Sequence, residues 1–405
     1  MKYFKNTELA EQFHVSEKSV RNWIDASQAG KLDLQLYEVN GRSYIADITK
    51  NINVIKELVT RGEKYKNKRG YKVVSPRPEF YELFDAKQIV EIISSINFRK
   101  EIPMQFNYVN AGADAWNDYA NRLDSEESAN ILKSCRELLE SNLDSLDRLI
   151  GNYKRVNIID LGVGNALPVK GLLQHFIEKG LLNRYIGIDL SKNMLDIAEG
   201  NLVSWFGNKP KFEFYERDFT HDEFGDILAD DYMQNKDIPI NLILLFGGTI
   251  GNFAVPDDVL RIINRSMQPD DLFICELKLD TPNSRQFFDF YSKPSQVPTL
   301  ARHHRTTINL LNLDESMYDV VFKYDEAKNE RFIGAKLKID VSIKIHLNSV
   351  EHLIKLHKGD TIQVFRYRHL NAAGVNSLFH KNGFEVLQTS QSRDYEYFLS
   401  IAGRS

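Results

Sequence analysis

Short hydrophobic runs alternate with helix-like patterns through the central and C-terminal parts of the chain. Strand-like runs occur at 156–160, 185–189, 212–219, 240–246 and 271–278. A helical spacing of apolar residues follows the first run and continues to about Lys179. Two later runs, 383–389 and 395–402, follow a helix-like segment at 372–381 and are expected to pair in antiparallel fashion. The pattern predicts an α/β domain with a Rossmann-like, seven-stranded sheet.

The N-terminal part follows a different pattern, in which short amphipathic helices precede two strand-like runs. Helices are expected at 7–13, 16–25 and 48–61, and strands at 34–39 and 42–46. Ser16 is placed to cap the second helix. Asn40-Gly41 between the two strands is the strongest short signal for a tight hairpin turn. Two helices followed by a hairpin predict a winged helix-turn-helix.

The stretch from Glu8 to Ile24 resembles the winged helix-turn-helix of the MerR and excisionase type. The residues that carry the resemblance are Glu8-Leu-Ala-Glu, followed by Val15-Ser-Glu-Lys-Ser-Val-Arg-Asn-Trp-Ile24. We therefore expect a DNA-binding-like domain over residues 1–68. The residues that would contact DNA are Lys18, Arg21, Asn22 and Arg42. Winged helices also bind proteins, so a protein partner stays open.

Charge is distributed unevenly along the chain. Residues 1–75 hold fourteen Lys and Arg against nine Asp and Glu, a net charge of +5. The remaining residues hold thirty-eight against forty-seven, a net charge of −9. Because an acidic surface repels phosphate backbones, any nucleic-acid partner is expected at the N-terminal domain.

Composition narrows the class of protein. The 405 residues are 42% hydrophobic and 27% charged, which is typical of a folded globular protein of two or three domains. The two cysteines, Cys135 and Cys275, are in no metal-binding or disulfide-like spacing, which favours a reducing, cytoplasmic location. The longest apolar run is far too short to span a membrane, and no signal peptide is evident. No metal-ligand spacing is found among the ten histidines.

The expected domain order follows from these patterns. Residues 69–84 carry basic residues and two prolines and are expected to form a linker. Apolar residues recur at helical spacing in a cap segment, 85–150, that we expect to lie over the site of the next domain. The remaining predicted parts are a cofactor-binding core at 151–280, an inserted substrate or lid domain at 281–360, and final core strands at 361–405.

The turn after the first core strand indicates the kind of cofactor. Asp160, Gly162 and Gly164 form a glycine turn between strand and helix. A dinucleotide site would carry a third glycine at position 167, which is leucine here, and the chain has no phosphate-binding P-loop. A carboxylate at Asp160 would repel a pyrophosphate and attract a cation. S-adenosylmethionine carries a sulfonium and an ammonium and no phosphate, so it is the expected cofactor.

Acids at the next two strand ends agree with this cofactor. Asp189 ends the second strand and is placed to bind both ribose hydroxyls. Asp218 and Phe219 end the third strand, where they would offer an acceptor and an apolar surface to adenine. Seven strands in this order resemble the class I S-adenosylmethionine-dependent methyltransferases.

The turn after the fourth strand indicates which family of methyltransferases the chain resembles. Gly247-Gly-Thr-Ile-Gly-Asn252 is similar to the corresponding segment of the histidine-specific methyltransferases, a likeness that covers roughly residues 150–405 and includes Ile308-Asn-Leu-Leu-Asn312. The resemblance implies that Gly247 borders the cofactor and that Asn252 contacts the acceptor. It also implies that the inserted segment forms a lid over an amino-acid substrate.

One departure from the family concerns the acceptor. The family carries Glu-x-Ser-x-Lys in a late strand, with Glu and Ser holding histidine, whereas this chain has Val364-Phe-Arg366-Tyr-Arg368. We therefore expect free histidine to be a poor acceptor and Arg366 to bind a carboxylate near the methylated amine of a small molecule or peptide. Tyr108 either orients the amine or packs within the lid. The segment 302–305, Arg-His-His-Arg, is either a solvated loop or a carboxylate site.

Two other functions stay open. A nucleic-acid methyltransferase is disfavoured, because the chain lacks an Asp/Asn-Pro-Pro-aromatic tetrapeptide and a Pro-Cys nucleophile, and its catalytic half is acidic. A DNA-binding transcriptional regulator that senses S-adenosylmethionine without turnover would conserve the same cofactor-binding residues. Methyl transfer itself needs alignment and desolvation more than a strong base.

Overall fold

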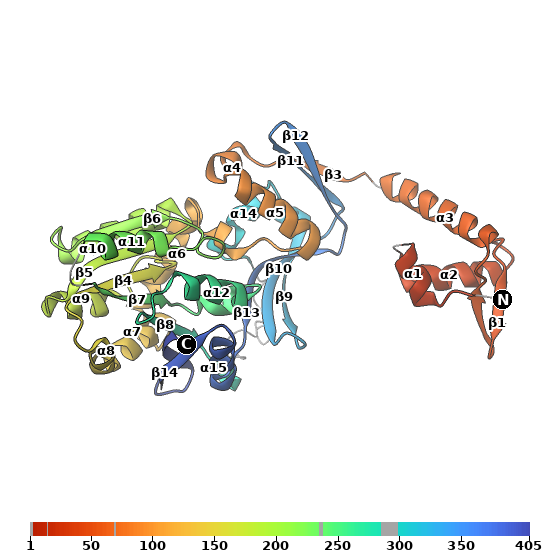
Figure 1. Ribbon diagram of the computed structural model, residues 1–405. Helices are drawn as coiled ribbons and strands as arrows, with labels where there is room; N and C mark the ends of the chain where they lie inside the picture. The colour runs from red at the N-terminus through yellow and green to blue at the C-terminus, as the bar shows by residue number, and fades with distance from the viewer. Residues whose placement is uncertain (1–2, 14, 69, 235–237, 285–298) are drawn as a thin grey trace. The chain divides into compact units, whose positions relative to one another are not determined.

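The computed structural model describes residues 3–13, 15–68, 70–234, 238–284 and 299–405. The chain divides into two compact units, Met1–Lys72 and Val73–Ser405 (Figure 1). Among the described residues, no helix is both long and apolar enough to cross a membrane.

The N-terminal unit contains the predicted helices and hairpin. Its elements are α1 (Asn6–Gln12), α2 (Glu17–Gln28), β1 (Leu36–Val39), β2 (Arg42–Ile45) and α3 (Thr49–Lys68). Ser16 caps α2 as expected, since its side chain accepts a hydrogen bond from the Ser19 N–H at 3.1 Å. Asn40 and Gly41 both have positive φ, which the tight turn between β1 and β2 requires. The unit has its own apolar core, made of Leu9, Ala10, Val20, Ile24, Leu34, Ile45 and Ile55.

The segment expected to be a linker is folded instead. Residues 72–74 form β3 (Lys72–Val74), which pairs with a strand of the second unit, and α4 (Pro78–Leu83) follows. Phe80 on α4 is fully buried. Because this stretch is rich in charged residues and prolines, the sequence pattern did not reveal that apolar side chains such as Phe80 are buried. Helix α3 also continues past its expected end at 61. Arg69 of the expected linker lies outside the described residues.

A seven-stranded sheet forms the centre of the second unit, as predicted. Its strand order is β14-β15-β8-β7-β4-β5-β6. Strands β4 to β8 run parallel, and β15 lies antiparallel between β8 and β14. The bounds are β4 (Val156–Leu161), β5 (Leu182–Asp189), β6 (Phe212–Glu216), β7 (Ile240–Leu245), β8 (Leu272–Lys278), β14 (Phe384–Gln391) and β15 (Tyr397–Arg404). Strand order reverses at β4, and open α/β sheets bind ligands at such a switch point.

Two apolar clusters cover the two faces of this sheet. One joins the strands to α7 (Ile131–Ser141), α8 (Leu143–Ile150), α9 (Lys170–Glu178) and α10 (Lys192–Phe206). The other joins them to α11 (Gly225–Gln234), α12 (Pro256–Ser266) and α15 (Ala372–Lys381). The predicted cap segment is therefore divided, because α7 and α8 belong to the core rather than to a cap.

A lobe with a separate core combines the segment inserted between β8 and α15 with elements that precede β4 in the chain. It contains the sheet β13-β10-β9 and the sheet β12-β11-β3 (Figure 1). Its strands are β9 (Tyr318–Asp325), β10 (Glu330–Leu337), β11 (Val341–Leu347), β12 (Val350–Leu356) and β13 (Thr361–Arg368). Its helices are α5 (Ala86–Arg99), η1 (Met104–Asn107), α14 (Thr306–Leu310) and η5 (Glu315–Met317), together with α4.

The boundary of this lobe differs from the expected one. Strand β13 was assigned to the core, but it pairs antiparallel with β10 and so belongs to the lobe. Residues 285–298 of the expected insertion lie outside the described residues.

Candidate functional site

The glycine turn after β4 brings three sequence-predicted residues together. Gly162 and Gly164 have φ values of +70° and +54°, which a side chain would strain. A Cβ at Gly162 would lie 3.7 Å from the ring of Phe219, and a Cβ at Gly164 would lie 3.3 Å from Nε1 of Trp116. The predicted Phe219 therefore borders the turn. Trp116, on α6 (Ala111–Ser125), is a neighbour that the sequence did not indicate.

Asp160 is a buried acid at the carboxyl end of β4, and Asp189 is a half-buried acid at the carboxyl end of β5. Asp160 is 4% exposed and accepts a hydrogen bond from the Tyr185 hydroxyl at 2.8 Å. Asp189 accepts one from the Ser191 N–H at 2.9 Å. Burial raises the pKa of each carboxyl to about 7. No lysine or arginine of the described residues pairs with either acid, although a buried charge ordinarily requires such a partner.

Asp218 lies beside residues that the sequence did not single out. Its Oδ1 accepts a hydrogen bond from the Thr220 N–H at 3.0 Å. Ligand atoms of Asp218, Glu91 and His221 lie within 4.8 Å of one another, close enough to hold a metal ion. His221 already pairs with Glu91 at 3.4 Å, and this contact raises the pKa of His221. Sequence spacing could not reveal this group, because Glu91 comes from the distant helix α5.

The turn after β7 is held by an acid that sequence reasoning missed. Gly247 and Gly248 have φ values of +72° and +68°. The Gly247 N–H donates a hydrogen bond to Oε2 of the buried Glu276 on β8 at 3.0 Å. Helix η2 (Thr249–Asn252) follows and ends at the predicted Asn252, whose Oδ1 is buried with no hydrogen-bond partner among the described residues. Burial raises the pKa of Glu276 to about 8.

Strand β13 presents the opposite face from the one expected. Arg366 is 8% exposed, and its guanidinium pairs with Glu101 at 2.6 Å and with Glu330 at 2.9 Å. Two buried carboxylates already neutralise it, so we withdraw Arg366 as an acceptor-binding residue. Side chains alternate along a strand, and the neighbouring Tyr367 points toward the core instead. Its hydroxyl donates a hydrogen bond to the Lys278 carbonyl at 2.7 Å.

Aromatic side chains gather around the predicted Tyr108. Its ring centroid lies 5.4 Å from that of Trp116 and 6.3 Å from that of His303. Tyr119 lies 5.6 Å from His303. Burial raises the pKa of Tyr108, which keeps its hydroxyl protonated. Tyr108 therefore lies in the same aromatic cluster as Trp116, which borders the glycine turn.

The segment 302–305 is divided between solvent and core, since Arg302 is exposed and pairs with Asp118 at 3.4 Å, whereas the two histidines are buried. It forms η4 (Arg302–Arg305), in which His303 and His304 are each 8% exposed rather than solvated. Burial lowers the pKa of His303 to about 4 and that of His304 to about 3, so both imidazoles are neutral near pH 7. Neutral rings have no charge with which to bind a carboxylate. The sequence did not indicate that these two histidines are buried, because their burial results from the packing of η4 against α6, which is distant in the chain.

Together, the strand order and the acids and glycines at the carboxyl ends define a class I S-adenosylmethionine-dependent methyltransferase. A family model described as "Histidine-specific methyltransferase, SAM-dependent" matches residues 86–403. The chain belongs to this family. It is an S-adenosylmethionine-dependent N-methyltransferase, and S-adenosylmethionine is its cofactor.

Solved methyltransferase structures match this chain at low sequence identity. A methyltransferase from Clostridium acetobutylicum ATCC 824 is 12% identical, with 72% of this chain and 99% of that chain covered and a TM-score of 0.36. The magnesium protoporphyrin IX methyltransferase of Synechocystis PCC 6803 is 13% identical, with 74% and 98% covered and a TM-score of 0.38. The glycopeptide N-methyltransferase MtfA is 12% identical, with 74% and 96% covered and a TM-score of 0.31. No curated protein sequence matches the chain.

Proposed function

We propose that the residues at the carboxyl ends of β4, β5, β6 and β7 bind S-adenosylmethionine. Asp160 takes the cationic end of the cofactor, and Asp189 accepts hydrogen bonds from the ribose hydroxyls. Asp218 and Phe219 receive adenine, while Gly162, Gly164 and Gly247 allow the backbone to approach the ligand. The observation that carries this assignment is the absence of a lysine or arginine partner for Asp160 and Asp189 among the described residues. Such buried acids suit a cation.

The acceptor in this proposal is an amine of a small molecule or peptide. The cofactor supplies a methyl group on a sulfonium, and the protein must align the acceptor nitrogen and exclude water. Asn252 offers its unpaired Oδ1 to that nitrogen. Tyr108 limits solvent access and orients the acceptor, and the neutral rings of His303 and His304 add no repelling charge. An amine can be bound there in its neutral, nucleophilic form.

The structure changes our expectation about free histidine. That expectation depended on Val364 and Arg366 lining the acceptor site. Both residues lie on the face of β13 that packs into the inserted lobe, where Val364 is fully buried and Arg366 is paired. Histidine, for which the family is named, is therefore again among the candidate acceptors, and a carboxylate on the acceptor has no assigned partner.

A screen for methylated products tests this function. Purified protein and isotope-labelled S-adenosylmethionine are incubated with histidine, other amino acids, peptides and duplex DNA, and the products are identified by mass spectrometry. We expect label on a nitrogen of an amino acid or peptide. Label on DNA alone would favour the nucleic-acid methyltransferase. Cofactor binding without any labelled product would favour a regulator that senses S-adenosylmethionine.

We also propose that the N-terminal unit is a winged helix-turn-helix that binds DNA. The solvent face of α2 carries Lys18, Arg21 and Asn22, and Arg42 lies on the hairpin; all four are exposed. The Arg21 guanidinium forms an ion pair with the Glu17 carboxylate, with an N–O distance of 3.0 Å. Lys18 and Arg42 are therefore the stronger candidates for phosphate contacts.

Salt dependence tests the DNA proposal. We expect the full chain to bind a fluorescent DNA duplex less tightly as salt rises, with the slope of log K against log salt reduced by about 1 for each of Lys18→Ala and Arg42→Ala. Lys338→Ala, at an exposed ion pair in the inserted lobe, is the matched control. Binding that is absent or insensitive to salt would assign the unit to protein interaction instead.

A further inference from the structure

Glu276 is a buried acid with an incomplete set of hydrogen bonds. Its side chain has no exposed surface and lies at the carboxyl end of β8. The backbone N–H groups of Gly247 and Gly248 are its donors, and the Gly247 bond to Oε2 measures 3.0 Å. The second oxygen, Oε1, is buried and has no hydrogen-bond partner among the described residues. A buried carboxyl oxygen without a hydrogen-bond partner is unfavourable, because it has lost its contacts with water and gained none in the protein.

The surrounding side chains do not supply the missing donor. Lys278, two residues along the same strand, has its Nζ 3.4 Å from Glu396 and 3.3 Å from the Tyr397 hydroxyl. Tyr367 directs its hydroxyl to the Lys278 backbone. The other titratable groups that sense the Glu276 charge are the buried thiols of Cys135 and Cys275. A thiol is only a weak donor.

A second unpaired acceptor lies at the other end of the same turn. The segment that starts with the Glu276 contact at Gly247 ends at Asn252, whose Oδ1 is also buried without a partner among the described residues. The Tyr367 ring closes one side of this segment, since a Cβ at Gly251 would come within 2.9 Å of it. Two acceptor oxygens without donors at the two ends of one turn point to a ligand that brings N–H groups.

We propose that Oε1 of Glu276 binds the nitrogen of the methyl acceptor, with Oδ1 of Asn252 as a second contact. The substrate class is then a basic amine, since a carboxylate forms its strongest hydrogen bonds with a cationic donor, and the ammonium must pass one proton to the carboxylate before its nitrogen can accept the methyl group. This inference rests on the proposed N-methyltransferase function and adds the residue that selects the acceptor.

The test needs no knowledge of the natural acceptor. Sinefungin is an analogue of S-adenosylmethionine that carries an amine in place of the methylsulfonium, and S-adenosylhomocysteine lacks this group. We expect calorimetry on the full chain to show tighter binding of sinefungin than of S-adenosylhomocysteine. In Glu276→Gln this preference should fall by about tenfold or more, while the affinity for S-adenosylhomocysteine stays within about twofold.

Proton release gives a second readout that a merely structural residue would not change. Since the pKa of Glu276 is raised to about 8, an amine bound beside it near pH 7 ionises the carboxyl group. Calorimetry in two buffers of different ionisation enthalpy should show greater proton release with sinefungin than with S-adenosylhomocysteine. This difference should disappear in Glu276→Gln and persist in Asp271→Asn, which alters a buried acid at the other end of the same strand.

Several outcomes would overturn the inference. An unchanged sinefungin preference in Glu276→Gln would show that the carboxyl group does not face the amine. Equal loss of affinity for both ligands would place Glu276 at the cofactor's own ammonium group instead. Wild-type protein that binds both ligands equally would also contradict it and leave the cofactor site intact, whereas failure to bind either ligand would reject the proposed function itself.

Discussion

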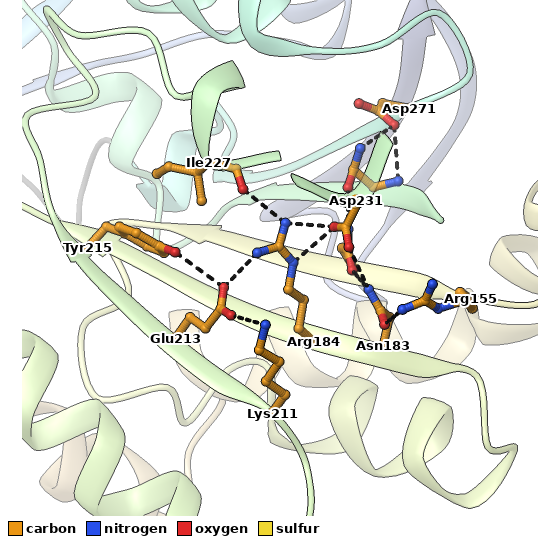
Figure 2. Close-up of polar contacts among 11 residues, drawn as sticks. Arg155, Asn183, Arg184, Lys211, Glu213, Tyr215, Ile227, Asp231 and Asp271 are labelled. Carbon is orange, nitrogen blue, oxygen red and sulfur yellow. Dashed lines mark hydrogen bonds and ion pairs between the residues drawn. The ribbon is translucent and has the colours of Figure 1, made fainter. Parts of the chain in front are cut away.

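Acidic side chains at the two ends of the central sheet differ in whether they have cationic partners. At the amino ends of the strands, Arg184 donates to Asp231 at 2.6 and 3.0 Å, to Glu213 at 2.7 Å and to the Ile227 carbonyl at 2.9 Å (Figure 2). Asn157 joins this network by donating to Asp231 at 2.8 Å. Each charge has a partner of opposite sign or an amide donor, and the pKa of Glu213 is accordingly lowered by its lysine and arginine partners despite partial burial.

At the carboxyl ends, the buried Asp160 and Glu276 and the half-buried Asp189 accept hydrogen bonds but form no ion pairs with any described lysine or arginine. Burial raises the pKa of all three. Asp271 at the amino end has a raised pKa too, but it accepts hydrogen bonds from Asn241 and Gln268. The amino-end acids are fully bonded within the fold, Asp271 through hydrogen bonds to both oxygens and Asp231 through Arg184, whereas the carboxyl-end acids without cations mark the edge where we propose that a cationic ligand binds.

The largest expected effect is on the free energy of unfolding, when the network of Arg184, Asp231 and Glu213 is broken. Arg184→Ala leaves Asp231 and Glu213 as uncompensated carboxylates, so we expect the free energy of unfolding to fall by about 3–5 kcal/mol in denaturant titrations. Lys192→Ala removes an exposed ion pair with Asp196 and should leave the free energy of unfolding nearly unchanged. Similar losses in the two variants would mean that the amino-end network does not stabilise the fold.

Removing an acid from the open end should affect ligand binding rather than folding. We expect Asp189→Ala to weaken S-adenosylmethionine binding by roughly 1–3 kcal/mol, because the ribose hydroxyls lose their acceptor. The unliganded variant should lose little stability, since the half-buried Asp189 has no ion pair with a described lysine or arginine and accepts a hydrogen bond only from the nearby Ser191 N–H. Calorimetry and thermal unfolding measure the two effects. Unchanged affinity would contradict the assignment of Asp189.

A smaller effect is expected in the pH dependence of stability and of cofactor affinity, because the pKa values of Asp160 and Asp189 are raised. An acid whose folded-state pKa is raised stabilises the fold below its unfolded-state pKa of about 4, and this stability is lost as pH rises toward 7. The cationic cofactor prefers the ionised acids, so its affinity should increase about tenfold or less between pH 6 and pH 8. Asp189→Asn should flatten both trends. A cofactor affinity that is constant over this range would show that the acids are already ionised in the free protein.

The sequence was sufficient for features that depend on neighbouring residues along the chain. The strands, the glycine turn and the positions of Asp160, Asp189 and Asp218 at strand ends all follow from local patterns, and the structure has them where expected. The outcome differed for Arg366, because its partners Glu101 and Glu330 lie 265 and 36 residues away. No local pattern reveals which acid will lie opposite a buried arginine.

Glu276 was missed for a related reason. It stands in an apolar strand as a single acid, and its relation to Gly247 exists only because β7 and β8 are neighbours in the sheet. The face of β13 was also undetermined, since one of its alternating buried positions is occupied by the charged Arg366, which a hydrophobic pattern alone does not place in a core. Long-range pairing, and not local propensity, decides these features.

The position of Trp116 has a spectroscopic consequence. The chain has three tryptophans, and this one borders the glycine turn through its contact with Gly164, among the rings of Tyr108, Tyr119 and His303. Trp23 belongs to the N-terminal unit, and Trp205 on α10 has the Lys170 ammonium over its ring. With phenylalanine at those two positions, indole emission would arise from Trp116 alone. Ligand arrival at the turn could then be followed by light, in real time and without a label on either molecule.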